Sequence, residues 1–148
     1  MTTLGGVELE LGRPEDAIAT FERAAALART FPDDPDGVLA TAETGLGRAL
    51  VLFARPRDAI PHLEAGLVWR EHQSDTPPAR LGTPRWFLAQ ALWLGGGGRA
   101  RSRVLAQQAQ ADFERAVAEF RMMPGPYQDA YKRSLILLDD VKAWRVTH

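Results

Sequence analysis

Apolar residues recur at spacings of three and four along most of this chain, which is the period of one face of an α-helix. In the segment from Gly12 to Ala24, for example, Ala17, Phe21 and Ala24 fall on the same face. No segment shows the alternation with a period of two that a half-buried strand requires. The pattern therefore predicts an all-α protein with no sheet.

Glycine and proline interrupt the helical pattern and divide the chain into about seven predicted helices. They are Met1–Leu11, Pro14–Arg29, Asp36–Ala54, Pro56–Glu71, Pro84–Leu94, Arg99–Met122 and Tyr127–Val146. The longest stretch without periodicity, Gln73–Thr83, is predicted to be a loop. Because the other connections are short, consecutive helices are expected to pack as antiparallel pairs in a solenoid.

Two predicted helices carry specific expectations about burial. The third should bury a stripe made of Leu39, Leu46, Leu50 and Phe53. In the first, apolar residues occur on more than one side, so one neighbouring helix cannot cover them all. We therefore expect uncovered apolar surface at this end, on some of Leu4, Val7, Leu9 and Leu11.

The sequence also repeats itself. The segment Gly12–Ala24 returns as Ala54–Gly66, and Ala17 and Ala59 are 42 residues apart. A glycine preceded by leucine recurs at the same interval, and a weaker third copy follows. The glycines are Gly5 and Gly47, and the third copy places Ser102, Ala106 and Ala109 at the small or packing positions. Small residues at such positions let two helices approach closely, while a large neighbour fills the gap beside them.

These repeats resemble the tetratricopeptide family. The interval is longer than the 34 residues of the standard repeat, so the chain is similar to the 42-residue variant with extended helices. The resemblance implies three helix pairs over residues 1–123 and a capping helix over 124–148, forming a superhelix. It also implies a scaffold for protein–protein interaction rather than an enzyme.

The C-terminal third has a narrower resemblance. Its segments R-W-F-L-A-Q-A-L-W-L, R-A-R-S-R-V-L-A-Q-Q-A and V-K-A-W-R-V-T-H are similar to the end of helical arrays appended to bacterial serine/threonine kinases. The kinase sequence motifs themselves are absent. The resemblance implies a role in bacterial signalling.

Composition excludes several other classes of protein. The net charge of -1 provides no general attraction to nucleic acid or to anionic lipid. No apolar run approaches the roughly 18 residues that a membrane-spanning helix needs. Cysteine is absent, which removes thiolate metal sites and fits a reducing cytoplasm.

The sequence contains no recognisable catalytic, cofactor or metal site. The run Gly95–Gly98 lacks the spacing and the preceding strand of a phosphate-binding loop, so we interpret it as a turn. The three histidines share no metal-ligand spacing. The arginines at 99, 101 and 103 are interpreted as a solvated helix face.

The family resemblance implies where a partner would bind. In tetratricopeptide repeats the first helix of each pair lines a concave groove, and carrying this over gives seven positions here. They are Thr41, Thr44, Arg48 and Val51 in the second pair, and Phe87, Leu88 and Ala91 in the third. Arg48 would bind a carboxylate of the partner. Phe87 would serve as an apolar anchor, although it and Leu88 could equally pack between helices.

A second hypothesis is structural. The chain could be a capping or dimerising segment of a larger repeat protein, without a peptide ligand and with self-association through its N-terminal helix pair.

Overall fold

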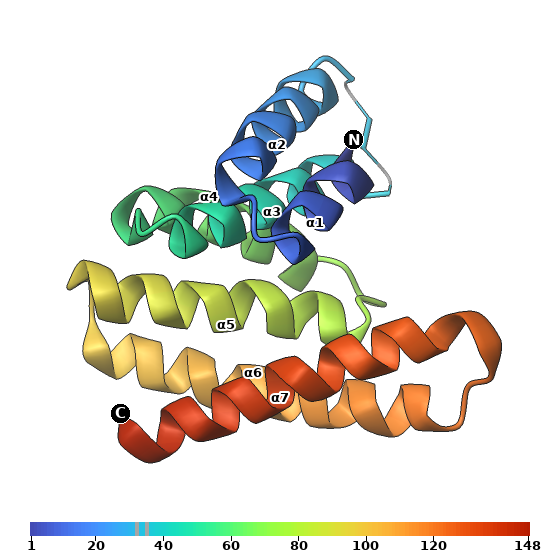
Figure 1. The fold of residues 1–148 in the computed structure, drawn as a ribbon, viewed down its shortest axis with the longest axis vertical. Coiled ribbons are helices and arrows are strands. Elements are labelled where there is room, and N and C mark those ends of the chain that lie inside the picture. The colour runs from blue at the N-terminus through green and yellow to red at the C-terminus, as the bar shows by residue number, and fades with distance from the viewer. Residues whose placement is uncertain (32, 35) are drawn as a thin grey trace.

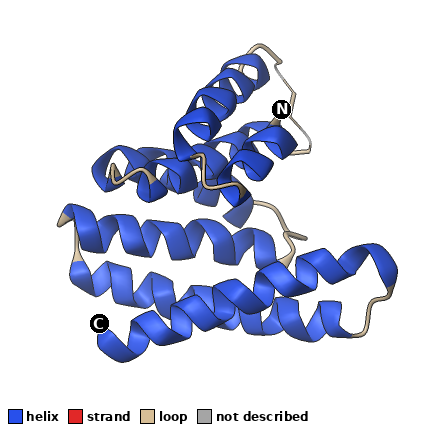
Figure 2. Ribbon diagram, viewed as in Figure 1, coloured by secondary structure: helices blue, strands red, loops and turns tan. Residues whose placement is uncertain are grey.

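The computed structural model describes all 148 residues except Pro32 and Pro35. The described residues form seven α-helices, one short 3₁₀ helix and no strand (Figures 1 and 2), which confirms the all-α prediction. The helices are α1 (Thr2–Glu10), α2 (Pro14–Ala28), α3 (Val38–Leu52), α4 (Pro56–Glu71), α5 (Pro78–Gly95), α6 (Arg99–Arg121), η1 (Gly125–Tyr127) and α7 (Gln128–Thr147).

Consecutive helices pack against one another along the whole stack (Figure 1). In addition, α1 contacts α3, α3 contacts α5, and α5 contacts α7. No comparable contact joins α2 to α4 or α4 to α6 within the described residues. The odd-numbered helices therefore form one continuous layer, and the even-numbered helices lie behind it.

The fifth helix begins earlier than the sequence suggested. The predicted loop Gln73–Thr83 is helical from Pro78 onward, so that part of the prediction was wrong. Pro84 lies inside α5, where it removes one backbone hydrogen bond. The Thr83 hydroxyl donates to the carbonyl of Ala79 over 2.9 Å, which supplies a hydrogen bond in the same turn. Pro84 itself is buried, so packing helps to hold the helix through this residue.

The repeat appears in the structure as the same contact made twice. Gly5 of α1 lies against the ring of Phe21, and Gly47 of α3 lies against Leu63. A methyl group on either glycine would come closer than 3.0 Å to the facing side chain. In the third pair, the buried Ser102 hydroxyl donates to the carbonyl of Ala89 over 2.6 Å. Small residues thus allow close helix contact in all three pairs.

The turns between paired helices also match. Gly12, Ala54 and Gly96 have left-handed backbones, with φ values of 68°, 57° and 75°. Each lies 42 residues after the one before it. Left-handed φ is unfavourable for a residue with a side chain. Ala54 therefore adopts the left-handed conformation that the repeat requires, although glycine is the residue type that favours this conformation.

Burial at the N-terminal end agrees with the expected uncovered surface. Leu9 is buried, whereas Leu4, Val7 and Leu11 are 52%, 45% and 65% exposed. Phe53 was expected to complete the buried stripe of α3, but it is 40% exposed because the helix ends at Leu52 and the chain turns there.

At the other end, α7 packs on α6 and reaches α5. Trp144 of α7 makes edge-on contacts with Trp86 and Trp93 of α5, with ring centroids 5.7 Å and 5.3 Å apart. Trp86 is 4% exposed, so it belongs to the core. These aromatic contacts attach α7 to the layer of odd-numbered helices.

Candidate partner-binding face

The seven predicted partner-binding residues divide into two groups by exposure. Five are buried within the chain itself, namely Thr44 at 6%, Val51 at 8%, Phe87 at 6%, and Leu88 and Ala91 at 0%. Thr41 and Arg48 are only partly buried. In the free chain, therefore, Thr41 and Arg48 are the members of the set with surface to offer.

Thr44 illustrates why the buried members are covered. Its hydroxyl donates to the carbonyl of Ala40 over 2.8 Å, and its oxygen lies against Gly66 of α4. It therefore faces the second helix of its own pair. Thr41 and Arg48 are seven residues apart on α3, two helical turns, so they lie on one side of that helix, next to Thr44.

Arg48 has an unusual environment for a charged residue. Its guanidinium carbon lies 5.1 Å from the centre of the Phe87 ring, a cation–π geometry that joins α3 to α5. Its Nε is enclosed and has no hydrogen-bond partner among the described residues. Burial lowers the pKa of Arg48, the charge of Glu10 raises it, and the charge of Arg133 lowers it.

The two charges near Arg48 come from opposite ends of the chain. Glu10 is the last residue of α1, and Arg133 lies in the second turn of α7. Their side chains are 61% and 64% exposed, and Arg133 Nη1 lies 3.6 Å from Glu10 Oε1. Sequence analysis missed both residues, because no local pattern brings together positions more than 120 residues apart.

Leu52 adds an apolar group beside Arg48. It lies one helical turn further along α3 and is 55% exposed. Its spacing from Arg48 could have indicated a shared face, but the sequence assignment used Val51, which is buried. We call Thr41, Arg48 and Leu52, with Glu10 and Arg133, the Arg48 face.

A second arginine is buried without a carboxylate. Arg70 of α4 is 4% exposed, and its Nη2 donates to the Thr41 hydroxyl oxygen over 3.0 Å. Its Nε has no partner among the described residues. Burial lowers the pKa of Arg70, and the nearby charge of Arg80 lowers it further.

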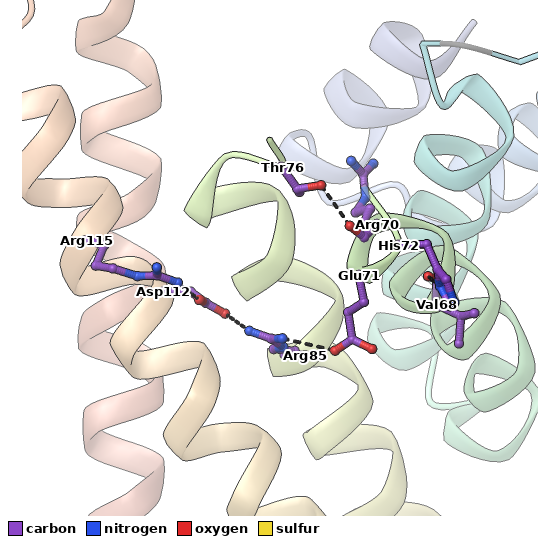
Figure 3. A network of polar contacts seen from close by, with 8 residues as sticks. All are labelled: Val68, Arg70, Glu71, His72, Thr76, Arg85, Asp112 and Arg115. Atoms are coloured by element: carbon purple, nitrogen blue, oxygen red, sulfur yellow. Dashed lines mark hydrogen bonds and ion pairs between the residues drawn. The ribbon is translucent and has the colours of Figure 1, made fainter. Parts of the chain in front are cut away.

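Arg85 of the same protein has carboxylate partners (Figure 3), although its Nε, too, is enclosed without a hydrogen-bond partner among the described residues. It donates to Asp112 of α6 over 2.7 Å and to Glu71 of α4 over 3.0 Å. Arg115 also donates to Asp112, over 2.6 Å. Burial alone would lower the pKa of Arg85, but the hydrogen bonds and charges of Glu71 and Asp112 outweigh it and raise the pKa. Figure 3 shows Arg70 extending to the opposite side from Glu71, outside this network.

Two recesses lie elsewhere on the surface. One, of about 320 Å³, is mainly apolar and lies between Met1, Leu27, Phe31 and Val38. The other, of about 310 Å³, lies between α6 and the end of α7 beside Trp144 and His148. We base the site on the Arg48 face instead, because a largely buried charge without a counterion points to ligand chemistry more directly than recess volume does.

The described residues contain no group of three or more His, Cys, Asp or Glu side chains that could hold a metal ion. Within the same residues, no helix has the length and apolar character needed to cross a membrane.

Comparison with known proteins identifies a family for the first part of the chain. The family model described as tetratricopeptide repeat matches residues 1–67, which contain α1, α2, α3 and most of α4. The match ends before the third helix pair begins. No curated protein and no solved structure matches the chain. Residues 1–67 are thus similar to tetratricopeptide repeats, as the sequence pattern predicted.

Proposed function

We propose that this protein is a non-catalytic scaffold that binds a segment of a partner protein on the Arg48 face. Tetratricopeptide repeats generally mediate protein–protein interactions, which supports the scaffold role. The observation that carries the location is Arg48 itself. It is a largely buried cation that forms no ion pair within the described residues and lies on the layer formed by α1, α3 and α5.

The chemistry of Arg48 favours an acidic partner. A buried guanidinium without a counterion is costly, and a carboxylate from outside would supply charge-assisted hydrogen bonds to it. The Phe87 ring packs against the Arg48 guanidinium, and Leu52 offers exposed apolar surface one helical turn further along α3. The partner segment should therefore carry a carboxylate with an apolar residue nearby.

Phe87 has a supporting role in this proposal. At 6% exposure it belongs to the core, so its contact with a partner would be made through Arg48. Leu88 and Ala91 would likewise shape the helix pair from within. Phe87→Ala should accordingly lower stability by about 3–5 kcal/mol, as truncation of a buried aromatic usually does. It is therefore a poor probe of binding.

Peptide display tests the proposal directly. Peptides selected from a random library on the wild-type protein should be enriched in Asp or Glu. Their affinity should fall about tenfold or more with Arg48→Met, which keeps the length of the side chain and removes its charge. Arg55→Gln is the matched control, because Arg55 is an exposed arginine of the α3–α4 turn whose ion-pair partner among the described residues is Asp58. Selection of no peptides, or equal binding by Arg48→Met, would contradict the proposal.

Exposed leucine and valine side chains at the N-terminal helix pair favour a second candidate function. Leu4, Val7 and Leu11, together with Leu27 of α2, leave apolar surface uncovered at the N-terminal pair. That surface would suit self-association or packing against further repeats. Light scattering over a range of concentrations distinguishes the two: a dimerising segment should show a mass that rises with concentration and falls in Leu4→Lys.

We further assign the repeats to the 42-residue form, with helix pairs over residues 1–123 and a cap over 124–148. The left-handed turns at Gly12, Ala54 and Gly96 support this interval. The packing of α7 on α6 and α5 supports the role of a cap. A place in bacterial signalling and in the cytoplasm rests on the C-terminal sequence resemblance and on the absence of cysteine.

A further inference from the structure

Two arginines at the start of α6 lie beside a group of aromatic side chains from α5 and the end of α7. The guanidinium carbons of Arg99 and Arg103 are 4.9 Å and 5.5 Å from the centre of the Trp93 ring. Trp144 packs edge-on against Trp93 and stacks on the His148 ring, with centroids 5.3 Å and 4.5 Å apart. The end of α7 therefore lies against the first turns of α6 (Figure 1).

The recess of about 310 Å³ between α6 and the end of α7 opens beside these rings. It is lined by Arg103, Val104, Gln107, Trp144, Arg145 and His148. None of these residues is acidic, and all except Trp144 are exposed. The volume is at the lower end of the range for small-molecule sites. The recess is therefore open to a small ligand from solution.

The positive charge at this recess has no acidic partner. The ion pairs of α6 and α7 involve other cations, namely Arg101, Arg115, Arg133 and Lys142. Among the described residues, no Asp or Glu is in ion-pair contact with Arg99, Arg103 or Arg145. Arg103 Nε donates to the His148 carbonyl over 2.7 Å and Arg145 donates to Gln110, so each guanidinium keeps further N–H groups for an anion.

The other lining groups indicate what this anion would be attached to. The stacked pair Trp144–His148 offers aromatic surface on which another flat ring can stack. Gln107 lies one helical turn from Arg103, and a glutamine amide can donate one hydrogen bond to the edge of adenine and accept another from it. The planar fork of a guanidinium suits a phosphate group. A phosphate, a flat ring and a hydrogen-bonding ring edge occur together in a nucleotide.

We propose that this recess binds a free adenine mononucleotide. Arg103 and Arg145 hold the phosphate, the base stacks on the Trp144–His148 pair, and Gln107 binds the edge of the base. This inference goes beyond the scaffold function and does not depend on the Arg48 face. Because α7 supplies three of the six lining residues, the nucleotide also strengthens the attachment of α7 to α6.

Adenosine monophosphate (AMP) is the probe for this site. In a ¹⁵N-labelled sample at constant ionic strength, the indole N–H signals of Trp93 and Trp144 should shift saturably as AMP is added. The dissociation constant should be below about 1 mM, the upper end of the usual range for small-molecule substrates. Adenosine, which lacks the phosphate, and inorganic phosphate, which lacks the base, should each bind about tenfold more weakly or worse. Absence of a saturable shift at both indoles would overturn the proposal.

Two variants test the roles of the lining residues. Arg145→Gln should weaken AMP binding about fivefold, and the exposure of Arg145 means that the fold should be kept. Gln107→Leu should reduce the preference for AMP over uridine monophosphate. Unchanged AMP affinity in Arg145→Gln together with unchanged base preference in Gln107→Leu would overturn the assigned roles and the site with them.

Arg101→Gln is the matched control for net charge. Arg101 lies on α6 between Arg99 and Arg103, but it pairs with Glu64 of α4 over 2.6 Å and does not line the recess. The substitution should leave AMP binding unchanged. A loss as large as that in Arg145→Gln would show a general effect of charge and would rule out the site.

Two further ligands test the class of molecule. O-Phosphotyrosine carries a phosphate on a flat ring without the edge of a base, and a single-stranded oligoadenylate carries the same base in a nucleic acid. AMP should bind more tightly than phosphotyrosine and at least as tightly as the oligoadenylate. Tighter binding of either ligand than of AMP would overturn the proposal, in favour of a phosphorylated protein or of a nucleic acid. Display-selected peptides that bind wild type and Arg145→Gln equally would leave the scaffold function intact whatever AMP does.

Discussion

At the level of single residues, the repeat imposes conditions that each copy meets differently. The turn after the first helix of each pair needs a left-handed residue, which Gly12 and Gly96 provide without strain. Ala54 adopts the same conformation with φ 57° and carries the penalty of its side chain. This difference between equivalent positions gives a direct test of the repeat geometry.

We expect Ala54→Gly to stabilise the protein by about 0.5–1 kcal/mol, because relief of the left-handed strain outweighs the added flexibility of the unfolded chain. Ala65→Gly is the control, since Ala65 is an exposed residue inside α4 and its replacement should destabilise by about 1 kcal/mol. Urea denaturation of the three proteins measures both changes. A loss of stability in Ala54→Gly would mean that the turn is not left-handed.

The small residues at helix contacts make a second residue-scale prediction. Ala17 and Ala59 are both 0% exposed. Ala17→Leu and Ala59→Leu should each overpack a helix contact and lower stability by about 1–3 kcal/mol. Ala19→Leu, on the exposed side of α2, should have little effect. Unchanged melting temperatures in both buried variants would show that these alanines are not at close contacts.

Arg70 of α4, which is buried, and Arg85 of α5, which is partly buried, should respond oppositely to loss of charge. Arg85→Met removes hydrogen bonds to Asp112 and Glu71 and should cost about 1–3 kcal/mol. Arg70→Met removes a buried cation that has no carboxylate, so stability should be unchanged or higher. Thermal unfolding of both variants measures these changes in stability. A larger loss in Arg70→Met than in Arg85→Met would refute this account of charge compensation.

At the level of helices, sequence periodicity predicted six of the seven segments to within a few residues. It succeeded where apolar residues recur at helical spacing between glycine and proline residues, as in α3 between Gly37 and Pro56. It failed at α5, where Pro84 was interpreted as a helix start and the true start is Pro78. A buried proline flanked by a Thr83 side-chain hydrogen bond is a tertiary feature, and local propensity does not reveal it.

The first helix should be less protected than α5. It has nine residues, and only Gly5 and Leu9 are buried, whereas eight of the eighteen residues of α5 are buried. Hydrogen exchange of a monomeric sample should therefore be faster in α1 than in α5. Equally slow exchange in α1 and α5 of a strict monomer would show that α1 is stabilised in a way the structure does not explain.

At the level of the whole molecule, only some residues of the candidate site could be predicted from the sequence. Arg48 and Thr41 could be predicted because the family pattern assigns partner binding to the first helix of each pair. The sequence could not exclude Leu88 and Ala91 from the site, because the burial of these two side chains depends on how closely α3, α4 and α5 pack. Glu10 and Arg133 could not be found at all, since only the folded chain brings their side chains to within 3.6 Å of each other.

The central claim is that a partner segment binds to the layer of odd-numbered helices around Arg48. The most direct test is to map the binding position of a display-selected peptide by chemical-shift perturbation over the backbone amides. The account predicts that the perturbed amides cluster in α3 around Arg48, with further changes near Glu10 in α1 and Arg133 in α7. Perturbations confined to α2, α4 and α6, or to the recess beside Leu27 and Phe31, would contradict it.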